Sequence, residues 1–288
     1  MSFNIVLNSS NVANSTTKSV YTYNFLGGGF TVNKHMKLCV SEIILPYSWF
    51  NINTQVYNNA SYQISLSTGT NIFTSSQTIT MPNGSYSITD IENYLQLWCL
   101  QNNFYKTNTT TGLIYYYVVW ALDLAFYAYQ ILCLPVETSA QAGCTYPASF
   151  PYPSVAYIPQ ITISSTNNFL SIVGFSAGSY PCSATTIVLS SVISNITPNF
   201  SPVNSLVVRC SLVNNNTGFS TDVLDVMPIN ATFGSNIYYL PNFEKFVRLS
   251  AGKYTSFSIT FQDQNLNTIY MNDSNITISL ILQDDTPN

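Results

Sequence analysis

The chain has 288 residues, of which only 7% are charged, with 8 Lys and Arg against 12 Asp and Glu. A typical soluble domain is roughly 25% charged, so the polarity of this surface must come from amides and hydroxyls, and the sequence holds 32 Asn and 21 Tyr. A net charge of −4 and scattered basic residues exclude a nucleic-acid binding mode that neutralises phosphates. The composition suits a surface covered by other protein, and argues against a free monomeric enzyme.

Strand patterns dominate from end to end, as short β-branched and aromatic runs separated by Asn, Ser, Gly and Pro. The sequence from Tyr254 to Phe261 alternates cleanly between polar and apolar residues, as a strand with one wet face requires. Together these runs predict an all-β fold. The predicted strands are residues 4–8, 20–26, 36–45, 62–67, 78–81, 114–119, 125–134, 160–164, 169–175, 186–190, 206–212, 254–261, 268–271 and 275–282.

One segment predicts a helix. Ser87 and Asp90 have the spacing of a capping box, with Asp in place of the usual Glu. Apolar residues then follow at the i, i+3, i+4, i+7 spacing of a helix face, namely Ile91, Tyr94, Leu95 and Trp98. We expect a single helix of about 12 residues.

Two further segments need an interpretation. Residues 135–159 contain five of the 13 prolines, too many for a regular element, and predict an irregular surface excursion. Residues 113–134 are long and apolar enough for a membrane span, but Asp123 in the middle would cost about 2.5–3.5 kcal/mol. Two successive buried strands that bend near Asp123 are therefore favoured over a span. No linker divides the chain, so we expect one domain over 1–288.

The six cysteines show no C-x-x-C pair and no regular spacing, and most lie in apolar runs. Unpaired Cys behaves as a small hydrophobe, which predicts buried thiols in a reducing intracellular compartment. The N-terminal residues lack the basic and apolar regions of a signal peptide, so secretion by that route is not expected. With one histidine and dispersed cysteines, no metal site and no cofactor are expected.

Candidate catalytic groups are few. His35 is the only histidine, there is no G-x-S-x-G, and a β-sandwich hydrolase would have to combine His35 with Asp222 and Asp225. We prefer His35 as a turn residue, and Asp222, Asp225 and the Asp284–Asp285 pair as solvated loop and tail charges. The chain is therefore not expected to be an enzyme.

Asp263 and Asp273 flank the predicted strand at residues 268–271. Their carboxylates are expected to accept hydrogen bonds from the turn backbone. A calcium site is the alternative, but the EF-hand spacing is absent.

Several stretches, in one order along nearly the whole chain, resemble the penton, or minor capsid, proteins of virophages and polinton-like viruses. Residues 135–159 and 115–129 match no pattern of that family. The stretches are IVLNSS at 5–10, LPYSWFN at 45–51, TMPNGSYSITDI at 80–91, QITI at 160–163, NFLSIVGF at 168–175, Tyr180-Pro181 and ITFQD at 259–263.

The resemblance implies a single jelly-roll β-sandwich with one short helix and a loop-rich insertion. It also implies a homopentamer at the five-fold vertex of an icosahedral virion, docked against trimers of the major capsid protein, and hence a role in viral assembly. An alternative stays open: a receptor- or glycan-binding β-sandwich, such as a fibre head or a lectin, would have the same strand pattern and aromatic content.

Overall fold

The computed structural model describes residues 2–65, 76–123, 125–150, 152–182, 188–214 and 221–285. The chain forms two compact units, where the sequence analysis expects one domain. Unit 1 comprises Met1–Trp49 and Val203–Asn288, and unit 2 comprises Phe50–Pro202. Unit 2 is thus inserted into unit 1. The first crossing lies beside the aromatic residues Trp49 and Phe50, and the second lies in residues 198–205, six of which are Pro, Asn or Ser.

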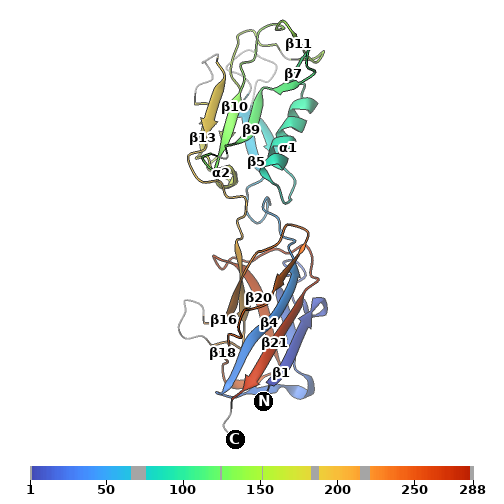
Figure 1. Ribbon diagram of the computed structural model, residues 1–288, viewed down its shortest axis with the longest axis vertical. Coiled ribbons are helices and arrows are strands. Elements are labelled where there is room, and N and C mark those ends of the chain that lie inside the picture. The colour runs from blue at the N-terminus through green and yellow to red at the C-terminus, as the bar shows by residue number, and fades with distance from the viewer. Residues whose placement is uncertain are drawn as a thin grey trace. The chain divides into compact units, whose positions relative to one another are not determined.

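Unit 1 contains two antiparallel sheets (Figure 1). The first has the order β1 (Ser2–Asn8), β21 (Thr277–Asp284), β4 (Met36–Pro46) and β17 (Asn236–Tyr239), and β18 (Val247–Arg248) also pairs with β4. The second has the order β16 (Val223–Pro228), β15 (Ser205–Cys210), β20 (Ser256–Asp263) and β2 (Val20–Asn24). A short separate pair joins β3 (Phe30–Val32) to β19 (Gly252–Tyr254).

The strand order of unit 1 is that of a jelly roll. When the eight strands of the two larger sheets are numbered from one to eight along the chain, β18 left aside, the sheets read 1-8-3-6 and 2-7-4-5. This arrangement nests two Greek keys between facing sheets, and it confirms the predicted jelly roll. Unit 2 is inserted between the third and fourth strands, β4 and β15.

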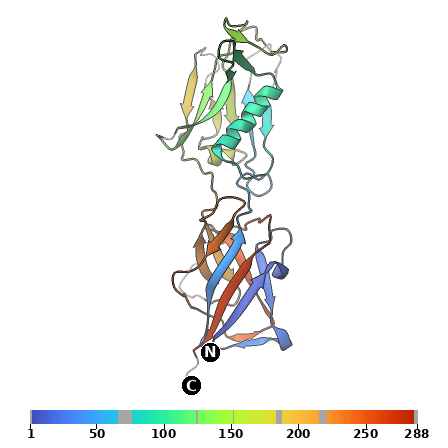
Figure 2. The same ribbon diagram turned by 45° about the vertical axis from the view of Figure 1, so that its right-hand side comes forward.

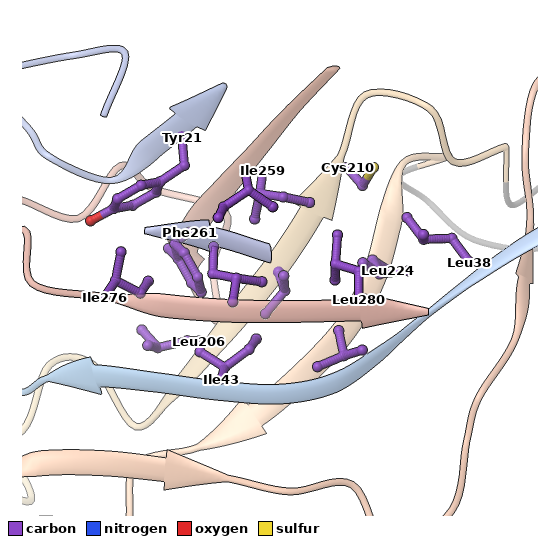
Figure 3. Packing of buried hydrophobic residues seen from close by; sticks show 14 of the residues in the cluster. Tyr21, Leu38, Ile43, Leu206, Cys210, Leu224, Ile259, Phe261, Ile276 and Leu280 are labelled. Atoms are coloured by element: carbon purple, nitrogen blue, oxygen red, sulfur yellow. The ribbon is translucent and has the colours of Figure 1, made fainter. Parts of the chain in front are cut away.

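The core of unit 1 lies between the two sheets. In β20 the predicted alternation is confirmed, because Phe257, Ile259 and Phe261 are buried and the residues between them are not. Figure 3 shows side chains of the other sheet, including Ile43 and Leu280, pointing toward them. Each such side chain contributes roughly 1.5–3 kcal/mol through burial, so this alternation fixes which face of each strand points inward.

Unit 2 combines three small antiparallel sheets with two helices. The first sheet has the order β13 (Gly178–Tyr180), β12 (Gln160–Ile163), β5 (Ser61–Ser65) and β6 (Gln77–Thr80). The second has the order β14 (Ser190–Ile193), β10 (Ala128–Cys133) and β9 (Val118–Asp123). The third has the order β11 (Cys144–Thr145), β7 (Tyr105–Asn108) and β8 (Ile114–Tyr116). The buried Trp120 centres the core, and its ring meets those of Tyr62 and Tyr129 at 5.7 Å in edge-on contacts.

Helix α1 (Ile88–Gln101) is the predicted helix, and it packs against β9 (Figure 2). The capping box is present: Asp90 N donates to Ser87 Oγ at 3.2 Å, and Ser87 N donates to Asp90 Oδ2 at 2.8 Å. Ile91 and Leu95 are fully buried, as the spacing predicts, whereas Tyr94 and Trp98 are only partly buried.

The strand predicted at residues 169–175 is wrong, because Phe169–Val173 forms the second helix, α2. Asn167 Oδ1 accepts a hydrogen bond from Phe169 N at 3.1 Å, and Gly174 ends the helix with a φ of 72°. A Cβ at Gly174 would lie 2.2 Å from the carbonyl oxygen of Ile196, so only glycine fits there. Short apolar runs do not distinguish a strand from a buried helix.

The apolar segment 113–134 forms β8, β9 and β10, with Asp123 paired to Ala128 across the turn between β9 and β10. The segment is thus made of strands that change direction after Asp123, as predicted, but there are three of them, and Ile114, Tyr115 and Leu122 are exposed rather than buried. Within the described ranges, no helix has the length and apolar character needed to cross a membrane.

The Pro-rich excursion is irregular as predicted, since its described residues form only β11 and a bridge between Val136 and Tyr157. It is not purely a surface feature, because Phe150 and Ile158 are buried in the core of unit 2. The strand predicted at 268–271 is reduced to a single bridge between Thr268 and Gln262. Parts of the predicted strands 62–67 and 186–190 lie outside the described residues.

Candidate interaction surfaces

One side of the unit 1 sandwich exposes large apolar side chains. β17 and β16 are the end strands of their respective sheets. They lie on the same side of the sandwich, because β16 also contacts β4, the neighbour of β17. The side chains exposed there are Val226 (47%), Tyr238 (58%), Leu240 (67%) and Phe243 (66%), and we call them the β16–β17 edge. Val226 faces outward from the second sheet and Tyr238 from the first, because their neighbours Met227 and Ile237 are buried in the core.

The backbone of this side is poorly suited to pairing with another strand. β17 has four residues and β18 only two, and Pro241 lies between them. Short edge strands and proline are the usual means by which sheets prevent addition of a further strand. A partner would therefore contact the side chains of the β16–β17 edge rather than extend the sheet.

A buried carboxylate holds this side together. Asp225 in β16 is 7% exposed and accepts hydrogen bonds from Tyr239 Oη at 2.8 Å and Lys245 Nζ at 3.2 Å. Burial and the nearby carboxylate raise the pKa of Tyr239 above its ordinary value, which keeps the phenol protonated as a donor. Lys245 also lies 5.5 Å from the ring centre of Phe243. These contacts position the side chains of the edge.

The carboxylates considered for catalysis have structural partners instead. Asp222 receives two hydrogen bonds from Arg209 Nε, at 2.9 and 3.0 Å, and Arg209 Nη1 donates to Gln262. Our preferred interpretation as a solvated loop charge is therefore wrong for Asp225, which is buried in β16 and paired with Lys245. Asp222 does lie in a turn with a partly exposed side chain, but it is paired with Arg209. His35 lies in the turn before β4, where its carbonyl accepts from Asp285 N.

The remaining acidic residues behave largely as predicted. Asp263 Oδ1 accepts from the backbone of Asn265 at 2.9 Å and of Asn267 at 2.7 Å, which confirms the turn that its carboxylate was expected to stabilise. Asp273 Oδ1 does the same for Asn275 N at 2.9 Å. Asp285, in the C-terminal pair, forms an exposed ion pair with Lys37.

Four of the six cysteines are buried, as predicted, while Cys144 is partly exposed and Cys182 is exposed. All six are free thiols. Burial raises the pKa of Cys39 to about 11 and that of Cys210 to about 12, so these thiols are protonated and unreactive at neutral pH.

Charged residues are concentrated in unit 1. Unit 2 has about half of the chain but only one basic residue, Lys106, and four acidic residues, which are Asp90, Glu92, Asp123 and Glu137. The low charge that the composition reports therefore belongs mainly to unit 2.

Unit 2 also exposes apolar side chains at the turn between β9 and β10. Phe126 and Tyr127 in the turn are 71% and 70% exposed, and Leu122 in β9 is 42% exposed. We call these three residues the hairpin tip. The hairpin tip is a second candidate contact surface, and the sequence analysis did not find it because it placed both flanking runs in the core.

Glu92 on α1 is the least compensated acid of unit 2. Its carboxylate accepts hydrogen bonds from Gln96 Nε2 at 2.6 Å and from the backbone N of Trp120 at the free edge of β9. Desolvation raises the pKa of Glu92 to about 7, even though both hydrogen bonds favour the charged form. Glu92 thus satisfies an edge N–H of the sheet, and the sequence pattern gave no indication of this role.

Taken together, the strand order and surfaces define an all-β protein with a jelly-roll unit, a charge-poor inserted unit and exposed apolar edges. Jelly rolls of this kind occur in viral capsid proteins and in lectin domains. No family model matches the chain, and no curated protein matches it in sequence.

Among solved structures, the chain is similar to the mavirus penton protein, with 10% identity, a TM-score of 0.46 and 98% of each chain covered. It is also similar to a chain in the cryo-EM structure of the Sputnik virophage, with 9% identity, a TM-score of 0.40, and 99% of this chain and 98% of that chain covered. A penton protein is thus among the structures similar to this chain, as the sequence resemblance implies. At these identities the fold assignment depends on the strand order of unit 1 itself.

Proposed function

We propose that this chain is a structural capsid protein that forms the pentameric vertex, or penton, of an icosahedral virion. Three features support the proposal: the jelly-roll strand order of unit 1, the penton-like stretches of the sequence, and the exposed apolar side chains of the β16–β17 edge. The last observation is the one that bears on assembly, because exposed large apolar side chains are frequent at contacts between proteins.

In this proposal five copies meet through heterologous contacts that close into a ring. The β16–β17 edge of one copy contacts a different surface of the next. Asp225 would remain compensated in such contacts, because it already has its partners within the subunit. Trimers of the major capsid protein would contact the remaining sides of the ring, and the virion is then where the protein resides.

Light scattering on the purified full-length chain, coupled to size-exclusion chromatography, tests the assembly. Five copies of the 31.9 kDa chain give a mass of about 160 kDa. The double substitution Leu240→Asp and Phe243→Ser is expected to reduce the mass to that of the monomer, because it places a charge and a polar group in the apolar contact. The substitution Leu26→Asp, at a side chain that is 94% exposed elsewhere in unit 1, is the matched control.

A protein that stays monomeric at concentrations of tens of micromolar, and that is absent from purified virions, would contradict the proposal. A pentamer that survives the double substitution would contradict the assignment of the β16–β17 edge. A monomer that binds a soluble glycan would favour the alternative, a receptor- or glycan-binding β-sandwich such as a fibre head or lectin.

A further inference from the structure

A pocket with a volume of about 380 Å³ lies against the three-stranded sheet β11-β7-β8 of unit 2. In this sheet Lys106 pairs with Tyr115, and Asn108 pairs with Cys144. Residues directly opposite on antiparallel strands share a face, as do residues two apart on one strand. The four side chains therefore lie on one face, and the loop at residues 141–143 completes the pocket.

The sheet lies at the end of unit 2 away from the residues where the chain enters and leaves it (Figure 1). The pocket is therefore formed by unit 2 alone, largely from the Pro-rich excursion and the strands that it pairs with.

Among the described residues that line the pocket, only Lys106 is charged, and it already has an ion-pair partner. The Lys106 side chain is 11% exposed, and its Nζ donates to Glu137 Oε1 and, at 2.8 Å, to Gln141 Oε1. Glu137 Oε2 in turn accepts from Tyr117 Oη at 2.8 Å, and Lys106 lies 5.4 Å from the centre of the Tyr117 ring. Because Glu137, which is not part of the lining, already compensates this cation, an anionic ligand would gain little attraction from Lys106.

Several polar groups of the pocket keep hydrogen-bonding capacity. Asn108 Oδ1 accepts from the backbone of Thr110 and Thr111 at 2.9 Å, which leaves its NH2 group for a ligand. Gln141 uses its Oε1 atom toward Lys106, which leaves its NH2 group as well. The Tyr115 side chain is 39% exposed, and offers both a hydroxyl and a ring face.

We propose that this pocket binds an uncharged saccharide. The ring of Tyr115 would contact the apolar C–H face of one sugar, and the NH2 groups of Asn108 and Gln141 would donate to its hydroxyl oxygens. Sugar hydroxyls both donate and accept, so they suit a neutral site lined by amides and hydroxyls. The inference goes beyond the proposed capsid role and does not depend on the oligomeric state.

Saturation-transfer NMR and calorimetry on the full-length chain test the proposal. Maltotriose and cellotriose represent neutral surface polysaccharides, and mannotriose and N-acetyllactosamine represent the glycans of glycoproteins. Sialyllactose is the charged comparison. At least one neutral probe is expected to bind. Tyr115→Ala should weaken binding by about tenfold or more, whereas Tyr115→Phe keeps the ring and should retain most of the affinity. Tyr270→Ala, at an equally exposed tyrosine of unit 1 (40%), should change nothing.

The two accessible cysteines give an independent measurement that needs no substitution. Cys144 lines the pocket, whereas Cys182, also in unit 2, is exposed and is not part of the lining. A saturating neutral saccharide should slow the alkylation of Cys144 by iodoacetamide at least about threefold, and leave Cys182 unchanged, because a bound ligand blocks only the first thiol.

Three results would overturn the proposal: no binding by any neutral probe, preference for sialyllactose, or unchanged affinity in folded Tyr115→Ala protein. Equal protection of both thiols would also overturn it, since the ligand would then act elsewhere. A monomeric mass with saccharide binding intact would instead contradict only the proposed vertex assembly.

Discussion

Units 1 and 2 are both rich in β-strands and poor in charge, but they are stabilised differently. Unit 1 draws strands from both ends of the chain. The ion pair Lys37–Asp285 joins the two segments, while Arg209–Asp222 and Lys245–Asp225 lie within the C-terminal segment. Unit 2 is one continuous segment with an aromatic core around Trp120, and its single cation, Lys106, is paired with Glu137. The comparison teaches that scarcity of charge is most pronounced in the inserted unit, which has five charged residues, whereas the jelly-roll unit has fifteen.

The largest expected effect tests whether the two units unfold separately. Trp120→Ala should destabilise unit 2 by about 4 kcal/mol, because it removes a fully buried ring that contacts Tyr62 and Tyr129. Hydrogen exchange should show lost protection in β9 and β10 but not in β20 and β21. The matched change in unit 1, Phe261→Ala, should give the reverse pattern. Equal loss of protection in both units after either change would mean that they unfold as one.

A smaller effect tests whether unit 1 depends on its charge pairs. Asp225→Asn should lower the free energy of unfolding by about 2 kcal/mol, since it leaves Lys245 without its carboxylate and weakens the acceptor of Tyr239. Denaturant titration measures the loss. The control is Asp222→Asn, whose ion pair with Arg209 is about 29% exposed on both sides and should be worth about 1 kcal/mol or less. If the two substitutions cost the same, burial of Asp225 has no special role.

The third effect concerns Glu92, a desolvated carboxyl group of unit 2 that has hydrogen-bond donors but, among the described residues, no cation beside it. The pKa of Glu92 is raised from 4.5 to about 7, so the folded state holds a proton that the unfolded state releases. The contribution of Glu92 to stability is therefore complete below about pH 4.5 and is lost as the pH rises through 7.

Glu92→Gln should remove this dependence, and should leave unit 2 about 2 kcal/mol more stable than the unsubstituted protein at pH 8, with little difference at pH 4.5. Thermal or denaturant unfolding across that pH range is the measurement. Asp123→Asn, at the turn between β9 and β10, is the control. Coincident pH profiles of Glu92→Gln and the unsubstituted protein would show that the carboxyl is not desolvated.

Local patterns in the sequence were sufficient for several elements. The Ser87–Asp90 capping box and the apolar spacing after it predicted α1, and alternation predicted β20. The turns stabilised by Asp263 and Asp273 were also predicted, because an Asx side chain bonds to backbone only a few residues away. The run at residues 169–175 was misassigned because its length fits a strand as well as a short helix, and the decisive close approach of Gly174 to Ile196 is not local.

The sequence by itself determined that the chain folds as an all-β protein with one long helix and few charges, since periodicity and composition act over a few residues or over the whole chain. The jelly roll was implied only by the resemblance to penton proteins. Only the tertiary structure decided that unit 2 is inserted between β4 and β15, that Asp225 meets Tyr239 and Lys245, and that the pocket forms beside Tyr115. These features bring together residues that are far apart in sequence. Such contacts depend on how the strands pair and in which register, and the residue pattern of a single strand does not specify its pairing partner.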